Sequence, residues 1–203
     1  VYTTSSGLEL VTPLGTLTAD GWTDSPENVF VDRGIDYFNQ WELGPEQADY
    51  DVEEVAHIIT NLVKSRPSRT NIPVLGWFAA ASVSPYVRKW ESEFNPLQIS
   101  GETGAGKSAS TGLMTRLWGW SGEPASVDAP PHGLLTVMSS SVSVPVWLDE
   151  YKPSEIQQYR LDAFYQYLRN STRGGNINKG TAGLGSDSFR LSAPIIISGE
   201  ESA

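Results

Sequence analysis

A glycine-rich turn that ends in a lysine and a serine carries the clearest chemistry in the sequence. Residues 101–108 read GETGAGKS and match G-x-x-x-x-G-K-[ST] at every fixed position. Glycine suits such a turn because a Cβ would block the approach of backbone N–H groups to phosphate oxygens. The motif therefore predicts a phosphate-binding P-loop made of Gly101, Glu102, Thr103, Gly104, Ala105, Gly106, Lys107 and Ser108. Lys107 would neutralise the β- and γ-phosphates, and the hydroxyl of Ser108 would bind Mg²⁺.

A pair of acids ends the next strongly apolar run. Residues 144–150, VPVWLDE, are typical of a buried strand that finishes with Asp149 and Glu150. In P-loop ATPases an acid in this place holds the metal, so Asp149 is the second predicted ligand of Mg²⁺. Glu150 would polarise the attacking water as general base. An ordinary strand end is the alternative, but the pair after a P-loop favours hydrolysis over phosphate transfer to a small molecule.

A third apolar run, residues 193–197, ends at Ser198. In P-loop ATPases the strand beside the acidic strand ends in a polar sensor that contacts the γ-phosphate or the water. Ser198 is therefore a candidate catalytic residue of that kind, and an ordinary strand-end serine is the alternative.

The glycine-rich segment 173–186 has two interpretations. It is either a surface loop, or it brings a cation to DNA or to the nucleotide of a neighbouring subunit. The candidate cations are Arg173, Lys179 and Arg190.

The elements that must position these residues follow one another as strand, glycine loop, helix, loop and strand from Leu97 onward. Short apolar runs in this order are typical of an α/β fold with buried parallel strands. A helix from about Ser154 to Asn170 is expected before the glycine-rich segment. We place a boundary near residue 95, with a β-rich, then helical region at 1–94 and the nucleotide-binding core at 95–203.

The N-terminal region begins with short β-type runs separated by turn residues. Within residues 7–31 the runs LELV, TLTA and NVFV predict a small hairpin or meander. Asp51 and Glu54 resemble a capping box before an amphipathic stripe, which predicts a helix. A second helix is expected at 72–83, where Pro85 would end it, and a turn is expected around 86–93.

Aromatic and histidine residues have structural and functional interpretations. A core between sheet and helices is the favoured place for Tyr37, Phe38 and Trp41, and a platform for stacking bases is the alternative. His57 lies within the amphipathic stripe and is expected to be structural. His132 is expected at a helix start.

The composition of the chain limits the kinds of partner that it can bind. The net charge is −10, so the surface as a whole repels nucleic acid, and any contact with DNA must be local. The absence of cysteine excludes disulfides and thiolate zinc sites. No apolar run reaches the ~20 residues that a membrane span requires, so we expect a cytoplasmic protein without a membrane partner.

Together these motifs resemble the helicase-like P-loop ATPases that phages, plasmids and other mobile elements encode beside or fused to primases. The similar text covers about the second half of the chain: LQISGETGAGKS, the Leu-Trp-Gly after the P-loop helix, VWLDE, the YLRN segment and FRLSAPIIISGEE. The β-rich start and GWTDSPENVF are more loosely similar.

The resemblance implies an α/β P-loop NTPase core of RecA-like or superfamily-3-like, catalytic-glutamate type, with a parallel sheet and a small β-rich and helical N-terminal region. It also implies ATP and Mg²⁺ as ligands, a homo-oligomer, and DNA unwinding or translocation in mobile-element replication. A further strand and an arginine finger are expected beyond Ala203, so we expect a piece of a longer polypeptide. The alternative is an ATP-dependent switch or assembly module without motor activity.

Overall fold

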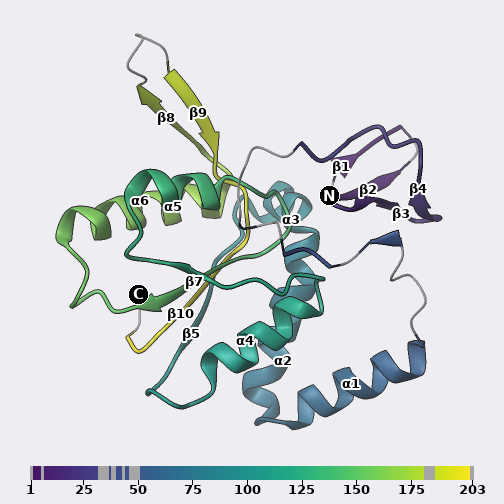
Figure 1. Ribbon diagram of the computed structural model, residues 1–203, viewed down its shortest axis with the longest axis horizontal. Coiled ribbons are helices and arrows are strands. Elements are labelled where there is room, and N and C mark those ends of the chain that lie inside the picture. Colours follow the sequence, from purple (N-terminus) through teal and green to yellow (C-terminus); the bar gives the residue numbers. More distant parts are fainter. Residues whose placement is uncertain are drawn as a thin grey trace.

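The centre of the molecule is a parallel sheet of four strands (Figure 1). The computed structural model describes residues 2–5, 7–31, 37, 40–42, 44–45, 51–180 and 186–201. The strand order is β5-β10-β7-β6, and all three pairings are parallel. The strands are β5 (Leu97–Ser100), β10 (Ile195–Gly199), β7 (Val146–Tyr151) and β6 (Ala125–Ser126). The predicted α/β class with a parallel sheet is confirmed.

Helices cover both faces of this sheet and make three layers (Figure 1). One core lies beneath α5 (Pro131–Met138) and α6 (Gln158–Arg173), and the other beneath α4 (Lys107–Arg116) and α2 (Ser68–Ser82). Successive strand residues enter the two cores alternately: Ile195 and Ile197 belong to the first, and Ile196 to the second. Alternation thus explains why the apolar run of β10 is continuous, since both of its faces are buried.

The predicted helix after Asp51 is α1 (Val52–Lys64), and the Asp51 carboxylate accepts a hydrogen bond from the Glu53 N–H. This bond satisfies one of the free donors at the helix start. The amphipathic stripe is only partly used, because Leu62 is buried whereas Ile58 and Ile59 remain about 40% exposed. Among the described residues no helix is both long and apolar enough to cross a bilayer.

The prediction of a turn around 86–93 is wrong, because most of this stretch belongs to the helix α3 (Ser84–Glu91). Pro85 occupies the first turn of α3 rather than ending α2. Proline is tolerated there because its missing N–H would have no partner inside the helix.

The N-terminal meander is confirmed, with one strand misplaced. Its order is β1 (Tyr2–Thr3), β2 (Leu8–Thr12), β3 (Gly15–Thr18) and β4 (Gly21–Thr23), all antiparallel. The last strand is GWT, and NVFV at 28–31 has no strand pairing. The Glu9 carboxylate accepts hydrogen bonds from the N–H groups of Glu27 and Asn28, so this segment is fastened by a side chain instead.

The glycine-rich segment forms a hairpin of β8 (Asn176–Gly180) and β9 (Ser186–Arg190), which projects from the body of the molecule (Figure 1). Residues 181–185, which join the two strands in the sequence, lie outside the described residues. The preceding helix α6 begins at Gln158, four residues later than expected, and ends with Gly174 in the left-handed conformation.

A β-bulge interrupts the pairing of β7 with β10 where both strands end. Leu148 pairs with Ile197, but the next pair is Tyr151 with Gly199, so two residues of β7 oppose the single Ser198. The extra residue shifts the alternation of β7 by one position.

The bulge decides which side chains are buried at the end of β7. Tyr151 is fully buried in the same core as Leu148, although simple alternation would direct Glu150 to that core. Glu150 is instead exposed and adopts a φ of 62°, a left-handed conformation that costs a non-glycine residue about 1–3 kcal/mol. The close approach of the strands also leaves no room at Gly199, where a Cβ would lie 2.2 Å from the Tyr151 carbonyl oxygen.

We expect Gly199→Ala to lower the free energy of unfolding by about 2–3 kcal/mol, because the backbone at the bulge must move. Urea denaturation measures the change. Gly133→Ala in α5 is the matched control, since a Cβ there meets nothing within 4 Å and alanine favours a helix by up to about 1 kcal/mol. Equal stability of the Gly199→Ala protein and the wild type would contradict this account of the bulge.

Candidate functional site

The predicted P-loop connects the end of β5 to the start of α4. Two of its glycines, Gly104 and Gly106, have φ values of 79° and 75°, which side chains with a Cβ rarely adopt. Gly106 is the N-cap of α4, so the free N–H groups of this ten-residue helix face the loop. The local geometry is therefore that of an anion-binding turn at a helix N-terminus.

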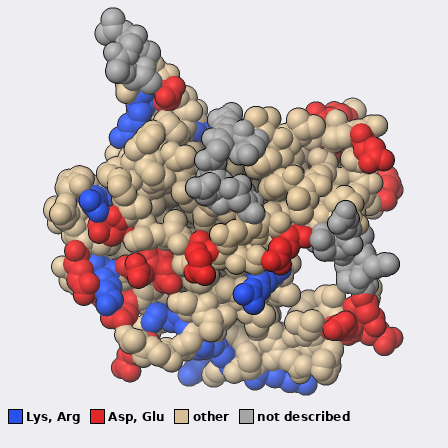
Figure 2. Space-filling view, in the orientation of Figure 1, with Lys and Arg blue, Asp and Glu red and all other residues tan. Residues whose placement is uncertain are grey.

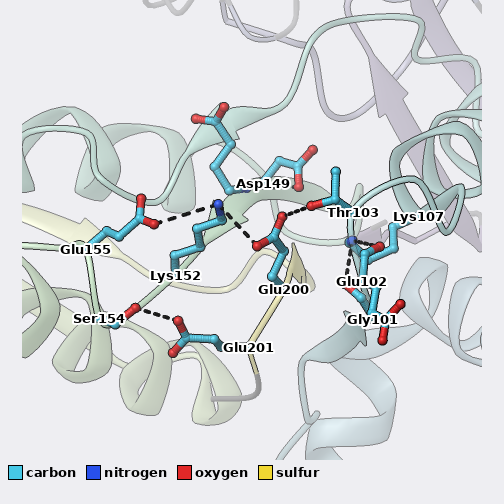
Figure 3. A network of polar contacts seen from close by, with 11 residues as sticks. Gly101, Glu102, Thr103, Lys107, Asp149, Lys152, Ser154, Glu155, Glu200 and Glu201 are labelled. Atoms are coloured by element: carbon cyan, nitrogen blue, oxygen red, sulfur yellow. Dashed lines mark hydrogen bonds and ion pairs between the residues drawn. The ribbon is translucent and has the colours of Figure 1, made fainter.

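Lys107, the first residue of α4, is folded back onto this loop. Its ammonium donates hydrogen bonds to the carbonyl oxygens of Gly101 and Glu102, at 2.6 and 2.9 Å (Figure 3). The loop thus contains its own cation.

Three predicted site residues meet on one carboxylate. The Ser108 hydroxyl donates to Oδ2 of Asp149 at 3.0 Å, and the Ser198 hydroxyl donates to Oδ1 at 2.6 Å. Both Asp149 and Ser198 lie at carboxyl ends of neighbouring parallel strands, and Ser108 comes from the helix that follows the P-loop. Residues 41 to 90 positions apart therefore form one polar cluster.

Ser198 is fully buried and has two partners within the protein. Besides donating to Asp149, its Oγ accepts a hydrogen bond of 2.6 Å from the indole N–H of Trp147. In this geometry Ser198 orients the Asp149 carboxylate. The sensor role toward a γ-phosphate or water stays a prediction.

Glu150 is exposed beside this cluster, and its N–H donates to Oδ1 of Asp149 at 2.9 Å. The bulge therefore directs one acid inward, toward two serines, and leaves its neighbour free to face solvent. A water-activating carboxylate requires such access.

Aromatic residues of the N-terminal region pack in the same core as Trp147. Tyr37 stacks on Trp120 with ring centroids 4.6 Å apart, and its hydroxyl accepts a 2.7 Å hydrogen bond from the Trp147 N–H. Burial raises the pKa of Tyr37, so the hydroxyl stays protonated. Trp41 is 6% exposed in the same core, which confirms the core interpretation for both residues. Phe38 lies outside the described residues.

A second polar network, which the sequence did not predict, crosses the mouth of the site (Figure 3). Glu200 accepts a hydrogen bond from the Thr103 hydroxyl and pairs with the Lys152 ammonium at 3.2 Å. These partners, Thr103 first, lower the pKa of Glu200, and Glu200 raises the pKa of Lys152. Beside them Ser154 donates to Glu201. Isolated charged residues at strand ends carry no sequence pattern that could have revealed these contacts.

Arg66, in the turn between α1 and α2, is another contact that sequence patterns missed. Its guanidinium donates to the carbonyl oxygens of Ala105 and Gly106, at 2.8 and 3.2 Å. The turn is itself held by Asn71, whose amide donates to the Leu62 carbonyl oxygen. The N-terminal helices thus brace the P-loop from outside.

The hairpin separates the cations of the glycine-rich segment. Lys179 lies over the Tyr167 ring, 5.6 Å from its centroid, on the face that also carries the partly buried Phe189. Arg190 is exposed on the opposite face. Arg173 is the exposed last residue of α6. His132 lies in the first turn of α5, as expected. His57 is exposed on α1, so it is not part of the buried side of this helix.

The P-loop and both networks line a pocket of about 690 Å³, within the range of small-molecule sites. Its charged lining is mostly acidic: Asp128, Asp149, Glu150, Glu155 and Glu200 face Lys107 and Lys152. The carboxylates of this lining would repel a polyanion, and a divalent cation would offset that repulsion. Within the described ranges no group of three or more His, Cys, Asp or Glu side chains is arranged around a metal position. Mg²⁺ at nucleotide sites needs only one or two carboxylates, because phosphates and waters complete its shell.

No protein-family model and no curated protein matches this sequence.

We expect Arg66→Ala to loosen the P-loop, because two charge-assisted hydrogen bonds to its carbonyls are lost. Hydrogen exchange by NMR should show the Ala105 and Ser110 amides, which bond within this loop and helix start, exchanging about tenfold faster. Arg69→Ala, which removes an exposed arginine of α2, is the control. Unchanged exchange in Arg66→Ala would show that the contact does not hold the loop.

Proposed function

We propose that this chain is a Mg²⁺-dependent ATPase with a P-loop NTPase core of the catalytic-glutamate type. The observation that carries the proposal is the meeting of Ser108 and Ser198 on Asp149, beside a glycine turn at a helix N-terminus. A P-loop hydroxyl, a strand-end acid and a neighbouring strand-end serine are the parts that the resemblance implies, and they lie within hydrogen-bond distance.

The strand order supports this type of core. β10 lies between β5, which leads into the P-loop, and β7, which carries the acids. In P-loop ATPases the strand beside the acidic one ends in a polar sensor, and β10 with Ser198 has this position relative to β7. β10 thereby brings the Ser198 hydroxyl within hydrogen-bond distance of the Asp149 carboxylate.

Ser108 and Asp149 fit a magnesium ion. A hydroxyl and a carboxylate are the hard oxygen donors that Mg²⁺ prefers, and they already face each other at 3.0 Å. When bound, the ion neutralises charge on the phosphates.

The remaining residues have separate tasks in hydrolysis. Lys107 neutralises phosphate charge from the P-loop side, and N–H groups at the start of α4 donate hydrogen bonds to the phosphate oxygens. Glu150 orients the attacking water and accepts its proton. Ser198 keeps the Asp149 carboxylate in one orientation, supported by Trp147.

Glu150→Gln should retain binding of ATP with Mg²⁺ and reduce turnover by roughly 10²–10⁴-fold, because the amide cannot accept the proton. Binding is measured by calorimetry and turnover by phosphate release. Glu155→Gln, which removes a more distant acid of the same pocket, is the comparison and should retain most of its turnover. Full turnover in Glu150→Gln would remove Glu150 from the role of base.

We further propose that hydrolysis drives DNA unwinding or translocation by a homo-oligomer, with the hairpin β8–β9 as the DNA contact. The face of the hairpin turned away from the core carries Asn176, Asn178, Ser186, Ser188 and Arg190, with Gly180, and no acid among its described residues. The chain as a whole has a net charge of −10, whereas the described residues of this face are polar and carry one positive charge. This face is therefore less repulsive to DNA than the average surface. Figure 2 shows acids in separate groups across the middle and the right of this view, with Lys and Arg among them and an acid on the hairpin as well.

Single-stranded DNA should stimulate ATP hydrolysis at low salt, and Arg190→Ala should weaken DNA binding. Loss of one phosphate contact would reduce the slope of log K against log salt by about 0.7 for a single strand. Fluorescence anisotropy over a salt series measures the slope, with Lys64→Ala on α1 as a control for loss of one charge.

An ATP-dependent switch or assembly module is the second candidate, and the acidity of the chain favours it. Association of subunits on addition of ATP, without DNA binding or stimulation by DNA at low salt, would support the switch and contradict the motor.

A further inference from the structure

Lys152 lies where a second cation could reach the phosphates of a nucleotide. It directly follows β7, three residues after Asp149, and lines the same pocket as Lys107 and Ser108. Its ammonium lies 3.2 Å from Glu200 and 3.8 Å from Glu155, and its side chain is 34% exposed. A surface ion pair of this kind contributes little to stability, about 0–1 kcal/mol, so stability alone does not explain its place in the pocket.

Glu200 occupies the position of an anion between this lysine and the P-loop (Figure 3). One of its oxygens accepts from the Thr103 hydroxyl, and the other pairs with Lys152. A phosphate oxygen accepts charge-assisted hydrogen bonds from the same kinds of donor. The Glu200 carboxylate therefore binds two donors, the Thr103 hydroxyl and the Lys152 ammonium, that could bind the phosphates of a nucleotide.

We propose that Lys152 is a second cation of the phosphate site, and that Glu200 holds it until the triphosphate of the nucleotide takes the place of the carboxylate. The inference rests on the proposed nucleotide site. Lys107 is held in the same way by the carbonyls of Gly101 and Glu102, so both cations rest on acceptors of the protein.

The exchange requires little rearrangement. Glu200 is the exposed residue after β10, and its side chain is 38% exposed, so the carboxylate can turn into water without opening the core. Its departure lowers the negative charge near the phosphates and leaves Lys152 and Thr103 facing them. Removing the lysine and removing the carboxylate should therefore have opposite effects on nucleotide affinity.

Calorimetric titration of the whole chain with ATP and Mg²⁺ tests the proposal. Lys152→Ala should weaken binding about tenfold or more, through loss of a charge-assisted contact. Lys152→Arg should stay within about threefold of the wild type, since a cation is retained. Glu200→Gln should tighten binding several-fold, by roughly threefold to tenfold, because a competing anion is removed. In a protein that already carries Lys152→Ala, Glu200→Gln should increase the affinity for ATP by a smaller factor than it does in the wild type.

Three comparisons make the outcomes distinct. Glu155→Gln removes an acid that pairs with Lys152 but does not contact Thr103, so it should tighten ATP binding less than Glu200→Gln. An equal gain in affinity would show a general charge effect and overturn the proposal. If Lys152→Ala and Glu200→Gln both weaken ATP binding, the two residues form a structural ion pair, and the proposal is overturned. Lys107→Ala tests the nucleotide site itself: if the wild type does not bind ATP, the proposed function fails, whereas binding that needs Lys107 but not Lys152 overturns this inference alone.

Discussion

The arrangement of the site depends on how the Asp149 carboxylate is held at the end of β7. Hydrogen bonds from Ser108, Ser198 and the Glu150 N–H converge on it. Each bond to a charged group contributes about 1.5–3 kcal/mol, whereas the positive φ of Glu150 costs about 1–3 kcal/mol. Three such bonds outweigh one strained residue, so the bulge is stable, and it is the bulge that separates a buried-facing acid from an exposed one.

The N-terminal region acts as a support for this site. Tyr37 and the tryptophan cluster hold Trp147, whose indole in turn holds Ser198. On the outer side, Arg66 braces the P-loop. A second arginine, Arg88 of α3, donates to the carbonyls of Ser171, Thr172 and Ser192, where α6 ends and β10 approaches. Burial lowers the pKa of Arg88 to about 10, so it remains charged at neutral pH.

β10 connects the two regions to which we assign function. Its carboxyl end carries Ser198 and leads to Glu200, and its amino end follows the hairpin closely. β10 is paired with β5 on one side and with β7 on the other, so it joins these two regions through one buried strand. Arg88 lies at the base of the hairpin.

Local patterns in the sequence determined the glycine turn, the start of α4, the apolar strands and the cap of α1, because each depends on neighbours within a few residues. The same patterns did not predict α3, because a proline can end one helix or begin the next. They also predicted a strand at NVFV, which pairs with no strand of the described residues. Only the tertiary structure decided the strand order, the bulge, and the contacts of Arg66, Lys152 and Glu200. These depend on residues far apart in the chain whose approach is governed by the packing of both faces of the sheet, which no local spacing records.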